Sequence, residues 1–257
     1  RCLGAKREEL GPPGPPLSHP VGLIVPHAGY RYSGGVAGVG FRALWKAGQP
    51  EAVVIFGTNH TGLGNSVTFA EPGAWETPFG PMPVHRELTL TLAEACGAEV
   101  SDTPFLDEHS VEVQLPFLHY LYGEIPFVAA VVQPLSQREA EAAGQALAQI
   151  LARKPLAILC STDFTHYEPH EVAKEKDLLA LRHVLDLDLP GFLSVVKARR
   201  ISICGVGALA LFIALAKALD LRASELLSYR TSGEVAGMMD QVVGYASAIF
   251  REVNAVA

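Results

Sequence analysis

Short apolar runs followed at once by small or polar residues recur along the chain and predict buried β-strands. These runs lie at residues 21–25, 52–56, 127–132 and 156–160. They alternate with longer stretches of helical composition, which we expect near residues 31–46, 86–96, 136–153, 172–184 and 190–198. Strands that alternate with helices favour a sheet in which several neighbouring strands are parallel. The pattern therefore predicts an α/β fold with a central mixed, largely parallel sheet and helices on both faces.

Weaker signals predict smaller elements. Residues 67–70 and 80–84 suggest a β-hairpin, and residues 226–229 and 242–250 have the composition of two last strands. Ser110 is placed to cap a helix that includes the apolar positions up to Leu118, because a serine hydroxyl accepts hydrogen bonds from free N–H groups of a first turn. These elements complete the predicted sheet and one further helix.

The stretch from Ile201 to Ala216 is free of charged residues. It is shorter than the roughly 20 apolar residues that a bilayer-spanning helix needs. It also contains Ser202, Cys204, Gly205 and Gly207 at its start, which favours a helix that begins near Gly205. We therefore predict a buried helix from about Gly205 and no membrane partner.

The N-terminal segment differs in composition from the rest of the chain. Residues 1–20 include an alternation of glycine and proline at 11–16, which is incompatible with a helix interior or a central strand. We predict an extended arm on the surface here, followed by a single α/β domain over residues 21–257. Because the sequence begins with Arg1 rather than methionine, we also expect that residues are missing before it.

Composition narrows the classes of partner. The chain has 257 residues, of which 49% are hydrophobic and 18% charged, and a formal net charge of -7. A compact fold is expected from these values, and an acidic chain lacks the clustered basic residues that bind nucleic acid or anionic membranes. The four cysteines show no C-x-x-C spacing and no secretory leader is evident. We therefore expect a cytoplasmic protein without disulfide bonds, in which Cys96 and Cys160 are structural.

Polar residues able to bind metals or move protons follow three of the predicted strands. His27 comes after the first strand, His60 after the second, and the sequence from Ser161 to His166 after the strand at 156–160. In sheets of this kind, ligands bind in the crevice beyond the carboxyl ends of the strands. Two imidazoles and the Cys204 thiolate would suit a transition metal with an open coordination position. The pattern thus indicates a metal crevice.

Each of these residues also has a structural interpretation. The structural interpretation of His27 is that it shapes a tight turn beside Pro26, and that of His60 is that it caps a following helix. Cys204 lies in an apolar stretch, where a free cysteine is usually a small buried side chain. Asp163 suits an N-cap, and residues 107–109 suit a charged loop. No dinucleotide-binding fingerprint, P-loop or nucleophile elbow is present to favour a nucleotide or serine-hydrolase site.

Five motifs together resemble those of the Memo family, whose bacterial and archaeal members are also called AmmeMemoRadiSam system protein B. The motifs are Pro26–Tyr30, Gly57–His60, Asp107–Glu112, Ser161–His166 and Ile203–Gly205. Their order and separations are similar to those of the family from about Val21 to Phe250. The resemblance implies a fold like that of the class III extradiol dioxygenases, or LigB-like proteins.

The resemblance also implies roles for individual residues. His27, His60 and Cys204 would be the metal ligands, with the cysteine in place of the carboxylate that dioxygenases use. His166 and Asp163 would be catalytic groups beside the metal. The pocket wall would include Tyr30, Asn59, Asp107, Glu108 and His109. The implied cofactor is one transition-metal ion.

A thiolate ligand favours Cu(I), Fe(II) or Zn over magnesium or calcium. With iron or copper, the preferred ions, we expect a redox, dioxygenase-like enzyme that acts on an unknown small molecule. One alternative is a non-catalytic metal-binding or peptide-binding adaptor protein, since a fold does not guarantee an activity. A second alternative is a zinc-dependent hydrolase. The resemblance further implies a pathway link to radical SAM and AMMECR-type proteins.

Overall fold

A nine-stranded mixed sheet forms the centre of the computed structural model, which describes residues 2–253. Eight strands follow the order β10-β11-β1-β8-β2-β7-β3-β6, and β9 pairs with β11. The four central strands are mutually parallel: β1 (Val21–Val25), β8 (Leu156–Ser161), β2 (Ala52–Thr58) and β7 (Phe127–Val132). Every residue of these four strands is buried, which explains their uninterrupted apolar sequences.

The flanking strands are mostly antiparallel to their neighbours. On one side, β11 (Val242–Arg251) pairs with β1, with β10 (Ala223–Thr231) and with β9 (His166–Glu168). On the other side, β3 (Val67–Phe69) is antiparallel to β7 and parallel to β6 (Glu99–Val100). The predicted central mixed, largely parallel sheet is confirmed.

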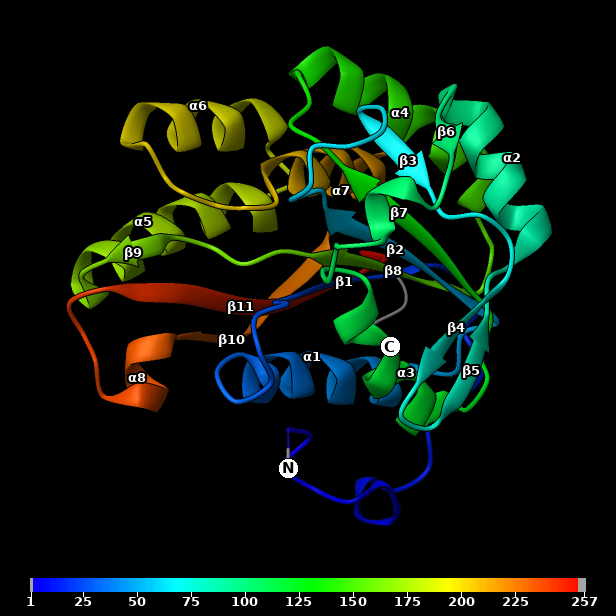
Figure 1. The fold of residues 1–257 in the computed structure, drawn as a ribbon, viewed down its shortest axis with the longest axis horizontal. Helices are drawn as coiled ribbons and strands as arrows, with labels where there is room; N and C mark the ends of the chain where they lie inside the picture. Colours follow the sequence, from blue (N-terminus) through cyan, green and yellow to red (C-terminus); the bar gives the residue numbers. More distant parts are fainter. Residues whose placement is uncertain (1, 254–257) are drawn as a thin grey trace.

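Helices cover both faces of the sheet, as predicted (Figure 1). One face is covered by α2 (Arg86–Cys96), α4 (Gln137–Leu151), α5 (His170–Leu185), α6 (Leu189–Arg199) and α7 (Val206–Ala218). The other is covered by α1 (Gly34–Ala47) and α3 (Leu115–Tyr122). Alternate strand residues enter the two cores, so that Ile24 packs on one side and Leu23 on the other, as the period of a strand requires.

Several predicted boundaries are confirmed together with their causes. Ser136 caps α4, because its hydroxyl accepts from the backbone N–H of Glu139 while the Glu139 carboxylate accepts from Ser136. Gly97 ends α2 in the left-handed conformation, with φ 60°, which glycine adopts without strain. The uncharged stretch forms α7 with Gly205 as its N-cap. Across the part of the chain that the structure describes, no helix is both long and apolar enough to cross a membrane.

Two predicted elements are wrong. Residues 67–70 do not pair with residues 80–84, because β3 joins the main sheet and the hairpin consists of β4 (Ala74–Thr77) and β5 (Gly80–Pro83). Ser110 does not cap a helix. Its hydroxyl donates to the Thr58 carbonyl at 2.7 Å, and the segment continues as the 3-10 helix η3 (Glu112–Gln114) before α3. Two further short 3-10 helices are η1 (Arg7–Leu10) and η2 (Thr103–Phe105), and α8 (Ser232–Ala236) follows β10.

The N-terminal arm is less extended than predicted. It contains η1 and contacts α1, where the indole N–H of Trp45 donates to the Gly11 carbonyl at 3.1 Å. Leu3 is buried in the core beside α1. A side chain at Gly38 would collide with the backbone of Cys2 and Leu3, so glycine permits this close approach. The arm is therefore packed along α1 at several points.

Candidate metal centre

The predicted site residues lie at one edge of the central sheet. His27 follows β1, His60 follows β2 and Asp163 follows β8. Because β1, β8 and β2 are adjacent and parallel, their carboxyl ends meet at the same edge. Cys204 comes from a fourth segment, immediately before the N-cap of α7. Four segments distant in sequence thus converge at one place.

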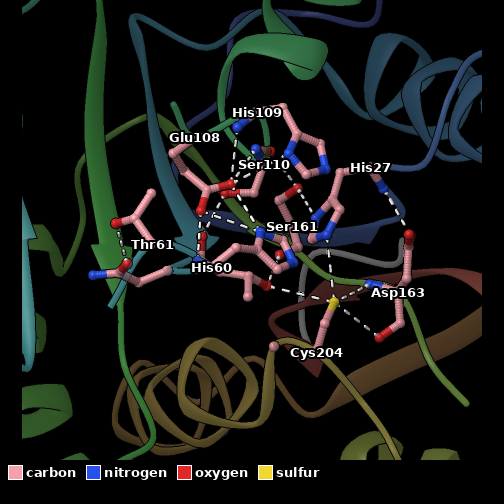
Figure 2. A network of polar contacts seen from close by, with 12 residues as sticks. His27, His60, Thr61, Glu108, His109, Ser110, Ser161, Asp163 and Cys204 are labelled. Carbon is pink, nitrogen blue, oxygen red and sulfur yellow. Dashed lines mark hydrogen bonds and ion pairs between the residues drawn. The ribbon is translucent and has the colours of Figure 1, made fainter. Parts of the chain in front are cut away.

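His27, His60 and Cys204 face one another across a small space (Figure 2). Their donor atoms all lie within 4.8 Å of one another. The Cys204 Sγ lies 3.4 Å from the His27 Nε2, and the two imidazole centroids are 5.1 Å apart with planes at 88°. Two nitrogens and a sulfur in this arrangement form a donor set for a transition-metal ion.

A serine determines which nitrogen of His27 faces the shared space. The Ser161 hydroxyl donates to the Ser110 carbonyl at 2.5 Å and accepts from the Gln114 amide at 2.9 Å. Its remaining lone pair lies 3.0 Å from the His27 Nδ1. Since the hydroxyl proton is already used, Nδ1 must carry the hydrogen, and the Nε2 lone pair is left for a metal. Gln114 and Ser161 had not been predicted as site residues.

A buried glutamate orients His60. The Glu108 carboxylate is 2.9 Å from the His60 Nδ1 and accepts the His60 backbone N–H at 2.6 Å. It also accepts the backbone N–H groups of His109 and Ser110 at 2.9 and 2.8 Å. We predicted Glu108 in the pocket wall, and the structure places it behind His60 with 4% exposure. With Nδ1 engaged, the His60 Nε2 is directed toward the space shared with Cys204.

Polar groups surround the Cys204 sulfur. The Asp163 backbone N–H donates to Sγ at 3.2 Å, and the hydroxyls of Thr58 and Thr162 lie at 3.7 and 3.9 Å. Cys204 also lies at the N-terminal end of α7, where the helix dipole favours negative charge. The surroundings of Sγ therefore favour a thiolate, which is the form that binds metals.

Comparison with known proteins identifies the family of the chain. A family model described as Memo-like protein matches residues 4–249. The chain belongs to the Memo family. A MEMO1 family protein of Methanopyrus kandleri is 42% identical over 255 residues, covering 95% of this chain and 90% of the relative. A MEMO1 family protein of Thermotoga maritima is 39% identical over 256 residues, covering 96% of this chain and 90% of the relative.

A solved structure supports the fold of this Memo family member. The crystal structure of an uncharacterized protein from Escherichia coli K12 matches with a TM-score of 0.58 at 14% identity, covering 89% of this chain and 98% of that chain. At such low identity the likeness concerns the fold alone. The predicted family is confirmed, and so is the predicted α/β fold class with a central, largely parallel sheet.

Electrostatics couple the donor groups of this Memo family site. Burial raises the pKa of the Cys204 thiol, but hydrogen bonds with His27 and His60 outweigh burial and bring that pKa down to about 6. The hydrogen bond with Cys204, followed by that with Glu108, raises the pKa of His60 to about 10. Without a metal, the sulfur and His60 therefore favour a thiolate–imidazolium pair. A metal ion would take the place of the shared proton.

The two carboxyl groups of the site differ in pKa. Burial raises the pKa of Glu108, yet hydrogen bonds from His60 and from backbone N–H groups reverse the effect and lower it to about 2. Burial raises the pKa of Asp163 to about 6, and the His27 backbone N–H that donates to its Oδ1 at 2.8 Å offsets only part of this rise. Glu108 is thus a permanent carboxylate behind His60, whereas Asp163 holds the His27 backbone.

His109 is the third imidazole of the site. Its ring stacks on that of His60, with centroids 5.0 Å apart and planes at 10°, and meets the His27 ring edge-on at 5.3 Å. His60, Glu108 and His109 also form a second group whose potential ligand atoms lie within 4.8 Å of one another. The exposed His109 ring therefore lies beside both imidazoles of the donor set.

The other predicted residues form no hydrogen bond with the three donors among the described residues. His166 begins β9, and its Nδ1 lies 2.9 Å from the Ser202 carbonyl. The Asn59 carboxamide hydrogen-bonds within its own loop, to Thr61, Gly62 and Leu63. The Tyr30 hydroxyl donates to the Val113 carbonyl at 3.0 Å, and its ring lines an apolar cavity with Phe79 and Phe117. Asp107 is exposed and forms no hydrogen bond or ion pair with the described residues.

Proposed function

We propose that this Memo family member is a metalloprotein in which His27, His60 and Cys204 bind one redox-active transition-metal ion, iron or copper. We further propose that it acts on a small molecule at the mouth of this site. The observation that supports the proposal is the convergence of the three donor atoms within 4.8 Å. Their hydrogen bonds leave both Nε2 atoms and the Sγ directed at one another.

The donor set fits such an ion chemically. Each imidazole has its Nδ1 engaged by a protein group, Ser161 for His27 and Glu108 for His60, which is the arrangement that orients histidine ligands in metal sites. The thiolate adds a soft donor, which selects against magnesium and calcium. A bound iron or copper ion would supply electron transfer and activation of oxygen.

The protein side of the site has a buried and an exposed half. Glu108, Ser161 and Asp163 are buried and hold the ligands from behind. His60 and His109 are partly exposed, with side-chain exposures of 35% and 49%. A small molecule can therefore approach from the side of His109, while three protein ligands leave a coordination position open. His109 can donate a hydrogen bond to such a molecule, and His166 and Asp163 remain proposed catalytic groups.

Metal analysis tests this proposal. The chain is purified without oxygen, and iron, copper and zinc are quantified in the unaltered protein and in the His60→Ala and Cys204→Ala variants. We expect one iron or copper ion per chain in the unaltered protein. Each variant should bind the ion at least about tenfold more weakly, since a lost ligand costs no less than a lost supporting group.

Matched controls separate ligation from general damage. His19→Ala and Cys96→Ala remove a partly buried histidine and a partly buried cysteine away from the site, and both should retain the ion. Unchanged metal content in His60→Ala and Cys204→Ala would contradict the proposed ligands. Stoichiometric zinc instead of iron or copper would favour the hydrolase, and metal binding without oxygen consumption or turnover would favour the adaptor protein.

A further inference from the structure

The outer strand of the sheet, β10, offers one of its edges to solvent. It is nine residues long, contains no proline, and pairs only with β11 among the strands that the structure describes. An edge strand presents unpaired backbone N–H and C=O groups, to which another strand can add. Short strands, prolines and like charges usually prevent this addition. β10 is neither short nor interrupted by proline, so it lacks these two protections.

A β-bulge changes which side chains of β10 share a face. Leu226 pairs with Ala248 and Ser228 pairs with Ser247, so Leu227 is an extra residue. Leu226 and Tyr229 both pack against the core on the side of α5, although they are three residues apart in sequence. Leu227 packs against the opposite core, on the side of α1.

The bulge places Glu225 and Arg230 on the same face. Both residues flank the Leu226–Tyr229 segment, so both lie opposite the side chains of Leu226 and Tyr229, on the side of α1. Without the extra residue, an odd separation along the strand would put them on opposite faces. Both are exposed, and neither forms an ion pair with any residue from 2 to 253.

We propose that β10 pairs antiparallel with β10 of a second copy of this chain, with the twofold axis between Leu227 and Ser228. In this register, Glu225 lies opposite Arg230 of the second copy, and Arg230 lies opposite Glu225 of the second copy. Leu226 lies opposite Tyr229 of the second copy on the other face. A twofold contact repeats each of these pairs, and the two sheets become continuous across the dimer.

The charged side chains of β10 favour the proposed pairing with a second copy. Charged side chains prevent strand addition when equal charges meet, because like charges directly opposite each other destabilise a strand pair. Here each acidic side chain meets a basic one, on the same face and twice. Opposite charges in cross-strand pairs stabilise the sheet. Glu225 and Arg230 therefore favour pairing with β10 of a second copy over pairing with a strand that places like charges opposite them.

Charge reversal tests the interface in the full chain. The molar mass of the unaltered protein and of the Glu225→Arg, Arg230→Glu and doubly substituted variants is measured by sedimentation over a concentration series. We expect a dimer for the unaltered chain and at least about tenfold weaker association for each single variant, because like charges then face each other. The double variant restores opposite charges and should dimerise again.

The control variant is Glu51→Arg, which makes the same charge change at an exposed position just before β2, and it should remain dimeric. A monomeric unaltered chain at concentrations of about 100 μM, where even micromolar affinity gives a dimer, would overturn the proposal. A dimer that persists in both single variants would do the same. Circular dichroism of each variant confirms folding, and rescue by the double variant excludes misfolding as the cause.

Discussion

The Ser161 hydroxyl acts as donor in one of its hydrogen bonds and as acceptor in the others. These roles determine which nitrogen of His27 is free to bind a metal. The hydroxyl donates its proton to the Ser110 carbonyl and accepts a hydrogen bond from the Gln114 amide. The His27 Nδ1 can therefore contribute only as an N–H donor to the remaining lone pair. A metal site depends on such supporting groups as well as on its ligands.

Removal of this hydroxyl should weaken metal binding. In Ser161→Ala, the His27 Nδ1–H and the Gln114 amide lose an acceptor, and the imidazole loses the contact that fixes its tautomer. We expect the metal affinity to fall by about 10–100-fold, the usual effect of losing such a supporting group. Competition with a chromogenic chelator measures the change.

Ser247→Ala is the matched control for this substitution. Ser247 is also a buried strand serine, but its hydroxyl has no hydrogen-bond partner among the described residues. Its replacement should leave metal affinity unchanged and stability equal or slightly higher, because no hydrogen bond is lost. Equal losses of affinity in the two variants would contradict the role of Ser161.

Sequence patterns identify the three donors more readily than their supporting residues. His27, His60 and Cys204 belong to residue types that bind metals and stand at predicted strand or helix ends. Ser161 and Gln114 are ordinary polar residues, and their roles depend on contacts with segments distant in sequence. Gln114 gave one usable signal, since it is a polar residue between the apolar Val113 and Leu115.

At the scale of elements, the position of Cys204 depends on how closely α7 approaches the segment after β7. Gly207 lies in the first turn of α7, and a methyl group there would collide with the backbone of Gln133 and Pro134. These neighbours are main-chain atoms, which cannot move aside as a flexible side chain can. The glycine therefore permits the approach that brings Cys204 to the histidines.

The Gly207→Ala substitution should displace the start of α7. We expect it to lower the free energy of unfolding by about 1–3 kcal/mol, the usual cost of overpacking, and to weaken metal binding. Denaturant unfolding and chelator competition measure the two effects. Gly35→Ala in α1 is the control, because its added methyl group meets open space, and it should change stability by less than about 0.5 kcal/mol.

The sequence predicts most accurately those strands that are buried along their whole length, because nearly every residue in them is apolar. The strand at Phe127–Val132 is apolar throughout and was predicted at its observed bounds. The hairpin was mispredicted because β4 is exposed or half-buried along its length, so its residues show no apolar run. The Ser110 cap was mispredicted because the hydroxyl contacts Thr58, a residue of a different strand.

At the scale of the whole molecule, Asp177 connects three distant segments. It lies in α5, is fully buried, and accepts hydrogen bonds from the Thr165 N–H and hydroxyl and from the Tyr229 hydroxyl in β10. Burial raises the pKa of Asp177 from 3.8 to about 6, because the hydrogen bonds offset only part of the desolvation. The folded chain therefore holds this proton more tightly than the unfolded chain does.

Stability should consequently fall as the pH rises from about 4 to 6. In this interval the unfolded chain has already released the proton while the folded chain still retains it, so rising pH favours unfolding. The contribution is fully present below pH 4 and lost above pH 6. Since one pKa unit corresponds to about 1.4 kcal/mol, we expect a loss on the order of 2 kcal/mol.

The Asp177→Asn variant isolates this contribution, because asparagine has a similar shape and no titrating proton. Urea unfolding at pH 4 and pH 6 should show a smaller decrease in stability for Asp177→Asn than for the unaltered chain. Asp240→Asn, at an exposed position, should behave as the unaltered chain does. Identical pH profiles for the unaltered chain and Asp177→Asn would exclude Asp177 as the source.

The three donor residues are at positions 27, 60 and 204 of the 257-residue sequence, so an ion held by all of them would connect segments that span most of the polypeptide. Because the donor atoms come together only in the folded chain, binding of the ion stabilises the folded chain relative to the unfolded one. We expect the melting temperature to rise when the ion is added and to return to its former value with a chelator, as linkage requires. The ion would then serve this protein as a reversible cross-link, in the place that a disulfide bond occupies in other proteins.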